Sequence, residues 1–206
     1  MNAKRIRDPE ATKHALLNAA EEIFLEKGYG NASLSEIARK ANMTKSLIHH
    51  YFGSKVGLWQ EVKMRRFSSY MDQQLKMLQD QPATVELLSD SFRLYFHYLK
   101  NNPQMVRLLA WIFLERDEDG CLDMDKKLVR IGIEKFTELQ AKGKLRDDID
   151  PKFMQFVFIA LISHWFQDKE HFIKDYCKDG LPEGEDLDET FMESAAKIFM
   201  QGILPR

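Results

Sequence analysis

Apolar residues recur every three or four positions along most of the chain, as they do on a helix that buries one face. Leu34, Ile37, Ala38 and Ala41 show this spacing over one short stretch. No segment alternates apolar and polar residues for long enough to indicate a strand. The pattern therefore predicts an all-α protein with about nine helices.

Capping and turn residues mark where the predicted helices begin and end. Asp8-Pro9 places a side-chain acceptor before a proline at the first helical position, and Gly28 is suited to end that helix. Ser33 and Glu36 are spaced as a capping box at the start of a second helix. Turn residues between apolar stretches predict longer helices at residues 54–80, 84–101, 103–117, 122–142, 151–176 and 187–203.

Two short helices near the N-terminus are joined by only a few residues. Asn42 is suited to end the first of them, because asparagine tolerates left-handed backbone, and Thr44 is placed to cap the next. This arrangement is typical of a helix-turn-helix. We expect a three-helix DNA-binding domain at residues 1–57 and a larger domain of six helices at residues 58–206.

The short helix within "ANMTKSLIHHYF" has few side chains spaced to enter the core. Only Ile48 and Phe52 are spaced as a buried stripe. Four hydrogen-bonding side chains then face outward: Lys45, Ser46, His49 and His50. Such a face suits a recognition helix in the major groove, although a merely solvated face is the alternative. Adjacent histidines point about 100° apart on a helix, so we expect no metal site.

The charge is divided unevenly along a chain whose net charge is only −2. Residues 1–66 contain 12 Lys and Arg against 7 Asp and Glu, whereas the remaining 140 residues contain 18 against 25. A basic end on an acidic body suggests that one part of the molecule contacts a polyanion. Ordinary variation in surface charge is the alternative.

Several classes of protein do not fit this sequence. Cys121 and Cys177 are far apart and match no disulfide or metal motif, which suits a reducing compartment. The first residues are charged, and the longest apolar runs have seven residues, short of the roughly 20 needed to span a bilayer. We expect a cytoplasmic protein that does not enter membranes. No phosphate loop, nucleophile motif or spaced metal set occurs, so we expect no enzyme activity and no cofactor.

Residues 16–62, "LLNAAEEIFLEKGYGNASLSEIARKANMTKSLIHHYFGSKVGLWQEV", resemble the DNA-binding domain of the tetracycline-repressor (TetR) family. The similarity includes the F-x-E-K-G-Y helix end, the IA-x-x-A segment and the closing H-Y-F-x-S-K. It implies phosphate contacts from Ser33, Thr44, Tyr51 and Lys55, and positions near base edges for Lys45 and Ser46.

Two positions depart from the family pattern. Position 46 is more often a very small residue and position 49 more often tyrosine, so Ser46 and His49 leave the operator sequence open. The basic residues Lys4, Arg5 and Arg7 could reach a minor groove as an arm, and a disordered tail is the alternative.

The larger domain contains a segment, residues 151–176, that is apolar around nearly its whole circumference at its centre. Such a helix must be covered on every side, most easily by a second copy of the chain. Residues 187–203 offer a similar surface. The resemblance agrees, because the last two long helices of the family usually form a four-helix dimer interface. Two recognition helices about 34 Å apart would then read a palindrome.

The resemblance also implies an effector pocket in this domain. Candidate walls are aromatic residues with a few polar groups: His97, Tyr98, Trp111, Phe158, His164 and Trp165. Core packing is the alternative for each. An aromatic lining favours a flat or lipophilic effector.

The resulting expectation is a ligand-responsive, DNA-binding transcriptional regulator, most simply a homodimeric repressor released by a small molecule. A chromosome-associated or division-control protein with the same DNA-binding domain and no small-molecule inducer is the closest alternative. A purely structural helical module would leave the basic face unexplained.

Overall fold

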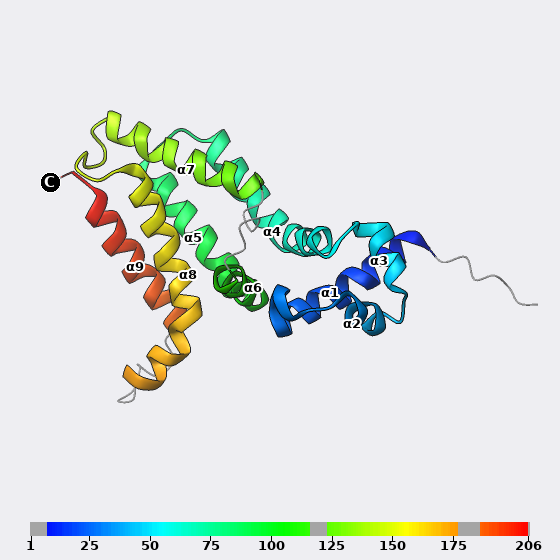
Figure 1. Ribbon diagram of the computed structural model, residues 1–206. Coiled ribbons are helices and arrows are strands. Elements are labelled where there is room, and N and C mark those ends of the chain that lie inside the picture. The colour runs from blue at the N-terminus through cyan, green and yellow to red at the C-terminus, as the bar shows by residue number, and fades with distance from the viewer. Residues whose placement is uncertain (1–7, 116–122, 177–185, 206) are drawn as a thin grey trace, which may run out of the picture. The chain divides into compact units, whose positions relative to one another are not determined.

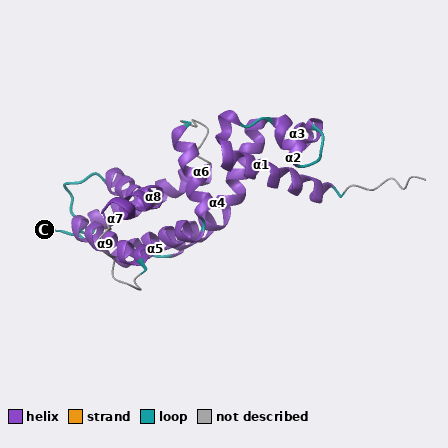
Figure 2. Cartoon of the chain, turned by 90° about the horizontal axis from the view of Figure 1, so that it is seen from below, coloured by secondary structure: helices purple, strands orange, loops and turns teal. Residues whose placement is uncertain are grey.

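The computed structural model describes residues 8–115, 123–176 and 186–205. Within these ranges the chain forms helices and no strand, which confirms the predicted all-α fold (Figures 1 and 2). The described helices are α1 (Pro9–Asn31), α2 (Leu34–Lys40), α3 (Lys45–Phe52), α4 (Lys55–Asp80), α5 (Val85–Asn101), α6 (Pro103–Leu114), α7 (Asp123–Ala141), α8 (Pro151–Tyr176) and α9 (Leu187–Ile203).

Most helix ends lie within a residue or two of the predicted positions, and two differ. Helix α6 ends at Leu114, before the predicted end at residue 117. In α1 the backbone leaves helical geometry at Gly28, as predicted, with φ 78° and ψ 173°, but helical hydrogen bonding resumes and continues to Asn31. The chain therefore turns sharply at Gly28 and then adds one short turn.

The described residues group into two compact units. Unit 1 contains the chain up to Ser68 together with Arg107 to Glu115, and unit 2 contains Ser69 to Val106 and the described residues from Asp123 onward. Helices α4 and α6 each contribute one part to each unit. The domain boundary proposed between residues 57 and 58 falls near the start of α4 and stays a prediction.

The core of unit 1 lies where α1 and α2 pack together and α2 packs on α3. The side chain of Phe24 meets the Trp59 ring edge-on, with 5.0 Å between the ring centroids, and Trp59 is only 1% exposed. Other buried members come from all four N-terminal helices: Leu16, Ala20, Ile37, Ile48, Phe52 and Leu58. This core fixes α3 on one side and leaves its other side to solvent.

The core of unit 2 is mainly aromatic. Helix α7 packs on α8, and α5 packs on both α8 and α9, which lie side by side (Figure 1). Phenylalanine rings contributed by these four helices are buried against one another: Phe92, Phe136, Phe158 and Phe199. The opposite sides of α8 and α9 expose large apolar side chains, among them Phe153, Phe156, Val157, Phe172 and Ile198. We call this surface the α8–α9 face.

Candidate nucleic-acid interface

The turn between α2 and α3 is built by short-range hydrogen bonds. The Ser33 hydroxyl accepts the Glu36 backbone N–H at 3.1 Å, which confirms the predicted N-cap of α2. Asn42 adopts the predicted left-handed conformation with φ 54°, and the next residue, Met43, donates its N–H to the Ala38 carbonyl at 2.8 Å. These contacts end α2 and direct the chain into α3.

Thr44 precedes α3 as predicted, but its side chain does not cap the helix. Its hydroxyl instead lies 2.8 Å from the Ser46 hydroxyl, and no side-chain cap bond forms. The expectation that Thr44 caps α3 through its side chain is therefore wrong, because the neighbouring hydroxyl takes the bond. The two hydroxyls form one polar group at the exposed start of α3.

Helix α3 divides into a buried side and an exposed side. Ile48 is 0% exposed and Phe52 8% exposed. The predicted outward residues are all exposed: Lys45, Ser46, His49 and His50. The structure thus gathers these four side chains on one face of a two-turn helix, and their contact with DNA stays a prediction.

The turn from α3 to α4 is very tight. Gly53 has φ 71° and ψ −54°, a conformation that side chains disfavour, and the Ser54 N–H donates to the Phe52 carbonyl at 2.8 Å. The Gly53 N–H donates to the His49 carbonyl at 3.0 Å, and the Gly53 carbonyl lies 3.0 Å from His49 Nδ1. The end of α3 is therefore tied to this turn at both polar atoms of Gly53.

The two remaining predicted phosphate-binding residues differ in their surroundings. Tyr51 is half-buried, and its ring meets the His50 ring edge-on at 5.0 Å between centroids. Lys55 Nζ donates to the Gly30 carbonyl at 3.2 Å and lies 4.4 Å from the centre of the Tyr29 ring. Burial lowers the pKa of Lys55, whereas the Glu115 carboxylate acts in the opposite direction. Lys55 is thus engaged with the end of α1.

The last part of α6 joins this same region of unit 1. Both carboxylate oxygens of Glu115 accept the Gly30 N–H, at 2.9 and 3.1 Å. Trp111 donates its indole N–H to the Leu25 carbonyl at 3.2 Å. These long-range contacts were not predicted, and they place Trp111 against α1 in unit 1.

Three other predicted effector-site residues are dispersed within unit 2. Phe158 is 4% exposed and packs against Phe92 and Phe199, so its surroundings are those of a core residue. His97 Nε2 lies 3.2 Å from a carboxylate oxygen of Glu189. Tyr98 stacks on Tyr70 with 4.6 Å between ring centroids.

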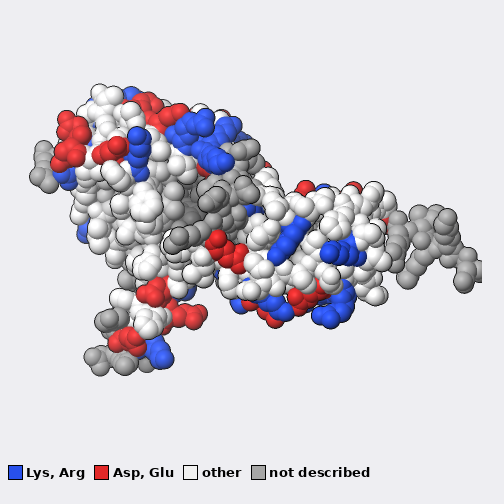
Figure 3. Space-filling view, viewed as in Figure 1, with Lys and Arg blue, Asp and Glu red and all other residues white. Residues whose placement is uncertain are grey.

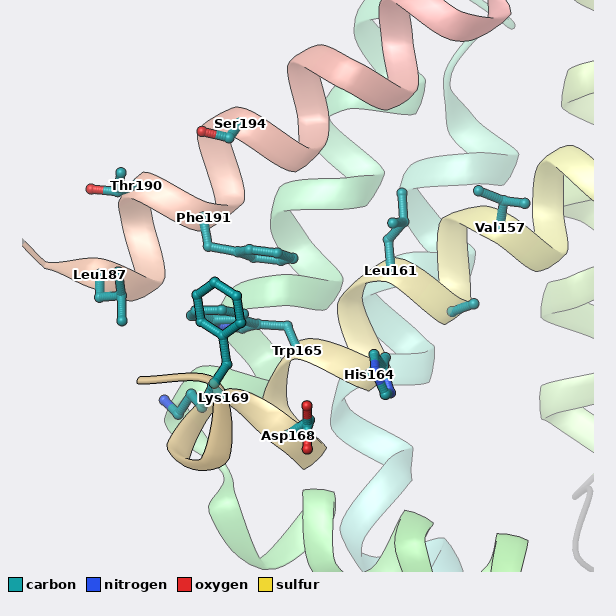
Figure 4. A pocket seen from close by; sticks show the side chains of 12 residues that line it. Val157, Leu161, His164, Trp165, Asp168, Lys169, Leu187, Thr190, Phe191 and Ser194 are labelled. Carbon is teal, nitrogen blue, oxygen red and sulfur yellow. The ribbon is translucent and has the colours of Figure 1, made fainter. Parts of the chain in front are cut away.

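His164 and Trp165 share an open groove of about 580 Å³ between α8 and α9 (Figure 4). The Trp165 ring stacks on Phe191 at 4.0 Å between centroids, and the Trp165 indole N–H donates to Asp188 at 2.8 Å. The remaining lining residues are Val157, Ala160, Leu161, Asp168, Lys169, Phe172, Leu187, Thr190 and Ser194. The groove belongs to the α8–α9 face, so the predicted effector site and the predicted dimer interface compete for His164 and Trp165.

Two buried polar contacts in unit 2 were not predicted from the sequence. Tyr95 and Ser163 share a hydrogen bond of 2.9 Å, and burial raises the pKa of Tyr95 to about 12. Gln74 is 2% exposed and donates its amide to Ser91, yet its Oε1 atom has no hydrogen-bond partner. Helical spacing from Met71 and Leu78 places Gln74 on the buried stripe of α4, and that spacing could have revealed it.

Burial also raises the pKa of Tyr70 well above its ordinary value. Its ring lies between Tyr95, at 5.3 Å, and Tyr98, at 4.6 Å. The Tyr95 ring, whose hydroxyl bonds to Ser163, is thus part of a group of three tyrosine rings in unit 2.

Across the described ranges, no helix combines the length and the apolar character needed to cross a membrane. The same part of the chain holds no group of three or more His, Cys, Asp or Glu side chains placed to bind a metal. The basic arm at Lys4, Arg5 and Arg7, as well as Cys121 and Cys177, lie outside the described residues.

Comparison with known proteins agrees with the helix-turn-helix. Residues 16–62 match the family described as bacterial regulatory proteins, tetR family, and residues 92–189 match the tetracyclin repressor-like C-terminal domain. The transcriptional repressor NicS of Pseudomonas putida is 23% identical over 84% of this chain and 83% of that protein. The transcriptional regulator RutR of Escherichia coli K12 is 29% identical over 98% of this chain and 95% of its own length.

A solved structure of a transcriptional regulator from Streptomyces coelicolor has the same fold. It superposes with a TM-score of 0.69 at 20% identity, covering 93% of this chain and 98% of that one. The two matched family domains together span more than half of the chain, and the first of them contains α2, α3 and the turn between them. This chain belongs to the TetR family of DNA-binding transcriptional regulators.

Proposed function

We propose that the protein is a homodimeric repressor that binds a palindromic operator and is released by a small-molecule effector. The observation that carries this proposal is the exposed polar face of α3, held rigidly by Ile48 and Phe52 beneath it and by the Gly53 turn at its end. A regulator of this kind acts where the chromosome is, and we place it in the cytoplasm.

Base edges and phosphates would be contacted by different parts of this surface. Lys45 and Ser46 lie in the first turn of α3, from which a recognition helix reaches base edges. Phosphates would be bound by Ser33 and Thr44, which precede two helix N-termini, and by Tyr51 and Lys55. Binding a phosphate through Lys55 Nζ would replace or share its bond to Gly30.

The α8–α9 face supports dimerisation through the last two long helices. Phe156 is 69% exposed on α8 and Ile198 is 70% exposed on α9. In Figure 3, a broad stretch of surface over α9 and the middle of α8 carries no charged side chain, whereas the C-terminal end of α8 does. Monomeric proteins rarely expose apolar patches of this kind, and a second copy with the same face would cover both.

We place the effector in the interior of unit 2 and leave the groove between α8 and α9 to the second copy. The buried Gln74 Oε1 atom lacks a partner, a deficit of about 1–3 kcal/mol that a bound donor would relieve. The rings of Tyr70 and Tyr98, stacked at 4.6 Å between centroids, supply aromatic surface in the same unit. A flat or lipophilic molecule with an N–H or O–H group fits these features.

Selection of bound fragments from a random duplex library, at two salt concentrations, tests the DNA-binding proposal. We expect an inverted repeat whose half-site centres are about one helical turn apart, roughly 34 Å, with affinity that falls as salt rises. Binding that is salt-sensitive but enriches no sequence would contradict the operator-binding repressor. It would favour a chromosome-associated protein that holds phosphates without reading bases.

A further inference from the structure

The side chain of His49 has its proton placed by a backbone contact. His49 Nδ1 lies 3.0 Å from the Gly53 carbonyl oxygen. A carbonyl oxygen can only accept a hydrogen bond, so Nδ1 carries the proton in this contact. In the neutral imidazole the other nitrogen, Nε2, then has a lone pair and can only accept.

The carbonyl that fixes this proton is itself held by the turn after α3. With φ 71° and ψ −54°, Gly53 turns its carbonyl back toward the last turn of the helix, while its N–H bonds to the His49 backbone. Only glycine adopts this conformation readily. The orientation of the His49 ring therefore depends on backbone geometry and on no flexible side chain.

His49 also lies where a base could meet it. It is exposed and follows Lys45 by one helical turn on the outward face of α3. Because Nδ1 is bonded to Gly53, the nitrogen left to meet DNA is Nε2. The residue thus presents an acceptor one helical turn from Lys45, whose ammonium group can only donate.

We infer that His49 reads a base amino group in the major groove, either N6 of adenine or N4 of cytosine. This inference rests on the proposed function, because it takes α3 as the recognition helix. Adenine and cytosine present amino donors in the major groove, whereas guanine and thymine present keto oxygens. An acceptor at Nε2 is attracted to the amino groups of adenine and cytosine and repelled by the keto oxygens of guanine and thymine. His49 therefore distinguishes A or C from G or T at one position of each half-site.

The first test is fragment selection at pH 8, where an ordinary imidazole is neutral, with the wild-type chain, His49→Ala and His49→Gln. The wild type should prefer A or C over G or T by about tenfold at one position per half-site. His49→Ala should lose that preference and keep the rest of the repeat. His49→Gln, which can both donate and accept, should narrow the preference to adenine. Thermal unfolding of each variant checks that its fold is intact.

The outcomes separate this inference from the proposed function. An inverted repeat that His49→Ala leaves unchanged at every position overturns the role of His49 and leaves the repressor intact. A preference for G or T that depends on His49 also overturns it, because the residue would then be donating. If the wild type enriches no inverted repeat, the proposed function and the base-reading role both fail.

The proton placement is tested without DNA. Proton–nitrogen correlation spectra of the histidine rings at pH 8 show which nitrogen is protonated, and comparison with His49→Ala identifies the signal among the six histidines of the chain. We expect His49 to carry its proton on Nδ1. A signal from a ring protonated on Nε2 would overturn the inference, since that nitrogen would then be a donor.

Discussion

The outward face of α3 and the α8–α9 face leave very different side chains in contact with water. On α3 the exposed residues are polar or charged, so the face is compatible with solvent whether or not a partner is bound. On α8 and α9, Phe156 and Ile198 are about seven-tenths exposed, at 69% and 70%. The first face suits a partner that binds transiently, and the second suits a permanent partner.

The two regions are also held together differently. The outward face of α3 depends on backbone geometry, with left-handed Asn42 before the helix and the Gly53 turn after it. Unit 2 depends on ring packing, for example Phe92 against Phe158 at 5.3 Å between centroids. Local sequence determines the first kind of contact, whereas the second joins residues far apart in the chain.

The largest effect is expected from a charge on the α8–α9 face. Ile198→Glu places a carboxylate where we expect a second copy to pack, and an unpaired buried charge is strongly unfavourable. The variant should be a monomer by sedimentation and should bind its operator about a thousandfold more weakly, because the two reading heads no longer act together.

Phe113→Glu provides the matched control. Phe113 is 78% exposed but lies on α6, outside the α8–α9 face, so this variant should remain a dimer. If Ile198→Glu is as dimeric as the control, the apolar face of α8 and α9 is not the interface.

The next effect concerns the turn in α1 that holds the end of α6. Gly28 has φ 78° and ψ 173°, a conformation open almost only to glycine. A Cβ there would overlap the Glu115 carboxylate and lie 2.7 Å from the Trp111 ring. Gly28→Ala should lower the free energy of unfolding by about 2 kcal/mol, measured by denaturant titration.

Gly30→Ala tests whether that loss comes from the special position. A Cβ at Gly30 would meet Glu115 Oε1 at 3.4 Å, which is ordinary contact, and its φ lies outside the positive range. This variant should be close to the wild type in stability. Equal losses for both substitutions would show that the backbone conformation at Gly28 is not the cause.

Sequence patterns predicted the helices well because the signals that set their ends are local. The Ser33 cap, left-handed Asn42 and the break at Gly28 each involve residues within a few positions of one another. The same kind of reasoning failed at Thr44, because two hydroxyl groups only two residues apart, on Thr44 and Ser46, bond to each other. Side-chain caps compete with such neighbours, and spacing alone does not decide the outcome.

Long-range contacts were beyond the reach of the sequence. Nothing local indicates that Lys55 bonds Gly30 or that Glu115, the residue after α6, binds the same glycine. In α8, apolar residues occur all around the helix, so periodicity could not tell that Phe158 is buried while Phe156 is exposed. The buried Gln74 was predictable as a position on the inner stripe, but its unpaired Oε1 atom was not.

Smaller losses of DNA affinity should distinguish residues that contact phosphates from residues on the outward face of α3 that contact bases. Lys55→Ala and Tyr51→Phe should weaken binding to every sequence. Lys55→Ala should also lower the slope of log affinity against log salt by about one, because it removes a cation. Lys45→Ala should instead change which operator is preferred, as measured by competition between selected sequences. If Lys45→Ala weakens all sequences equally, Lys45 does not read a base.

The smallest effect is expected from the ion pairs that join α5 to the start of α9, whose contribution to stability depends on pH. Lys100 Nζ donates to Asp186 and Glu189, each at 2.6 Å, and this lowers the pKa of both carboxyl groups from their ordinary values of 3.8 and 4.5. A lowered carboxyl pKa stabilises the fold above the ordinary value and is lost as pH falls through the lowered one. Lys100→Met should therefore reduce Tm at pH 7, and the difference from the wild type should shrink as the pH falls below the ordinary carboxyl values of 4.5 and 3.8. His97 also contacts Glu189, at 3.2 Å, and both proteins retain this residue.

Lys142→Met is the control for these ion pairs, because Lys142, the residue after α7, pairs with Glu138 of that same helix. Exposed pairs inside one helix contribute little, so this variant should change Tm less than Lys100→Met at pH 7. A Tm difference for Lys100→Met that does not shrink as the pH falls would mean that the stem of Lys100 stabilises the fold by packing, because the ion pairs weaken as the carboxylates become protonated. In that case the contact between Lys100 and the start of α9 would be apolar rather than ionic, and the ion pair of Lys169 with Asp188 would be a charged contact that remains there.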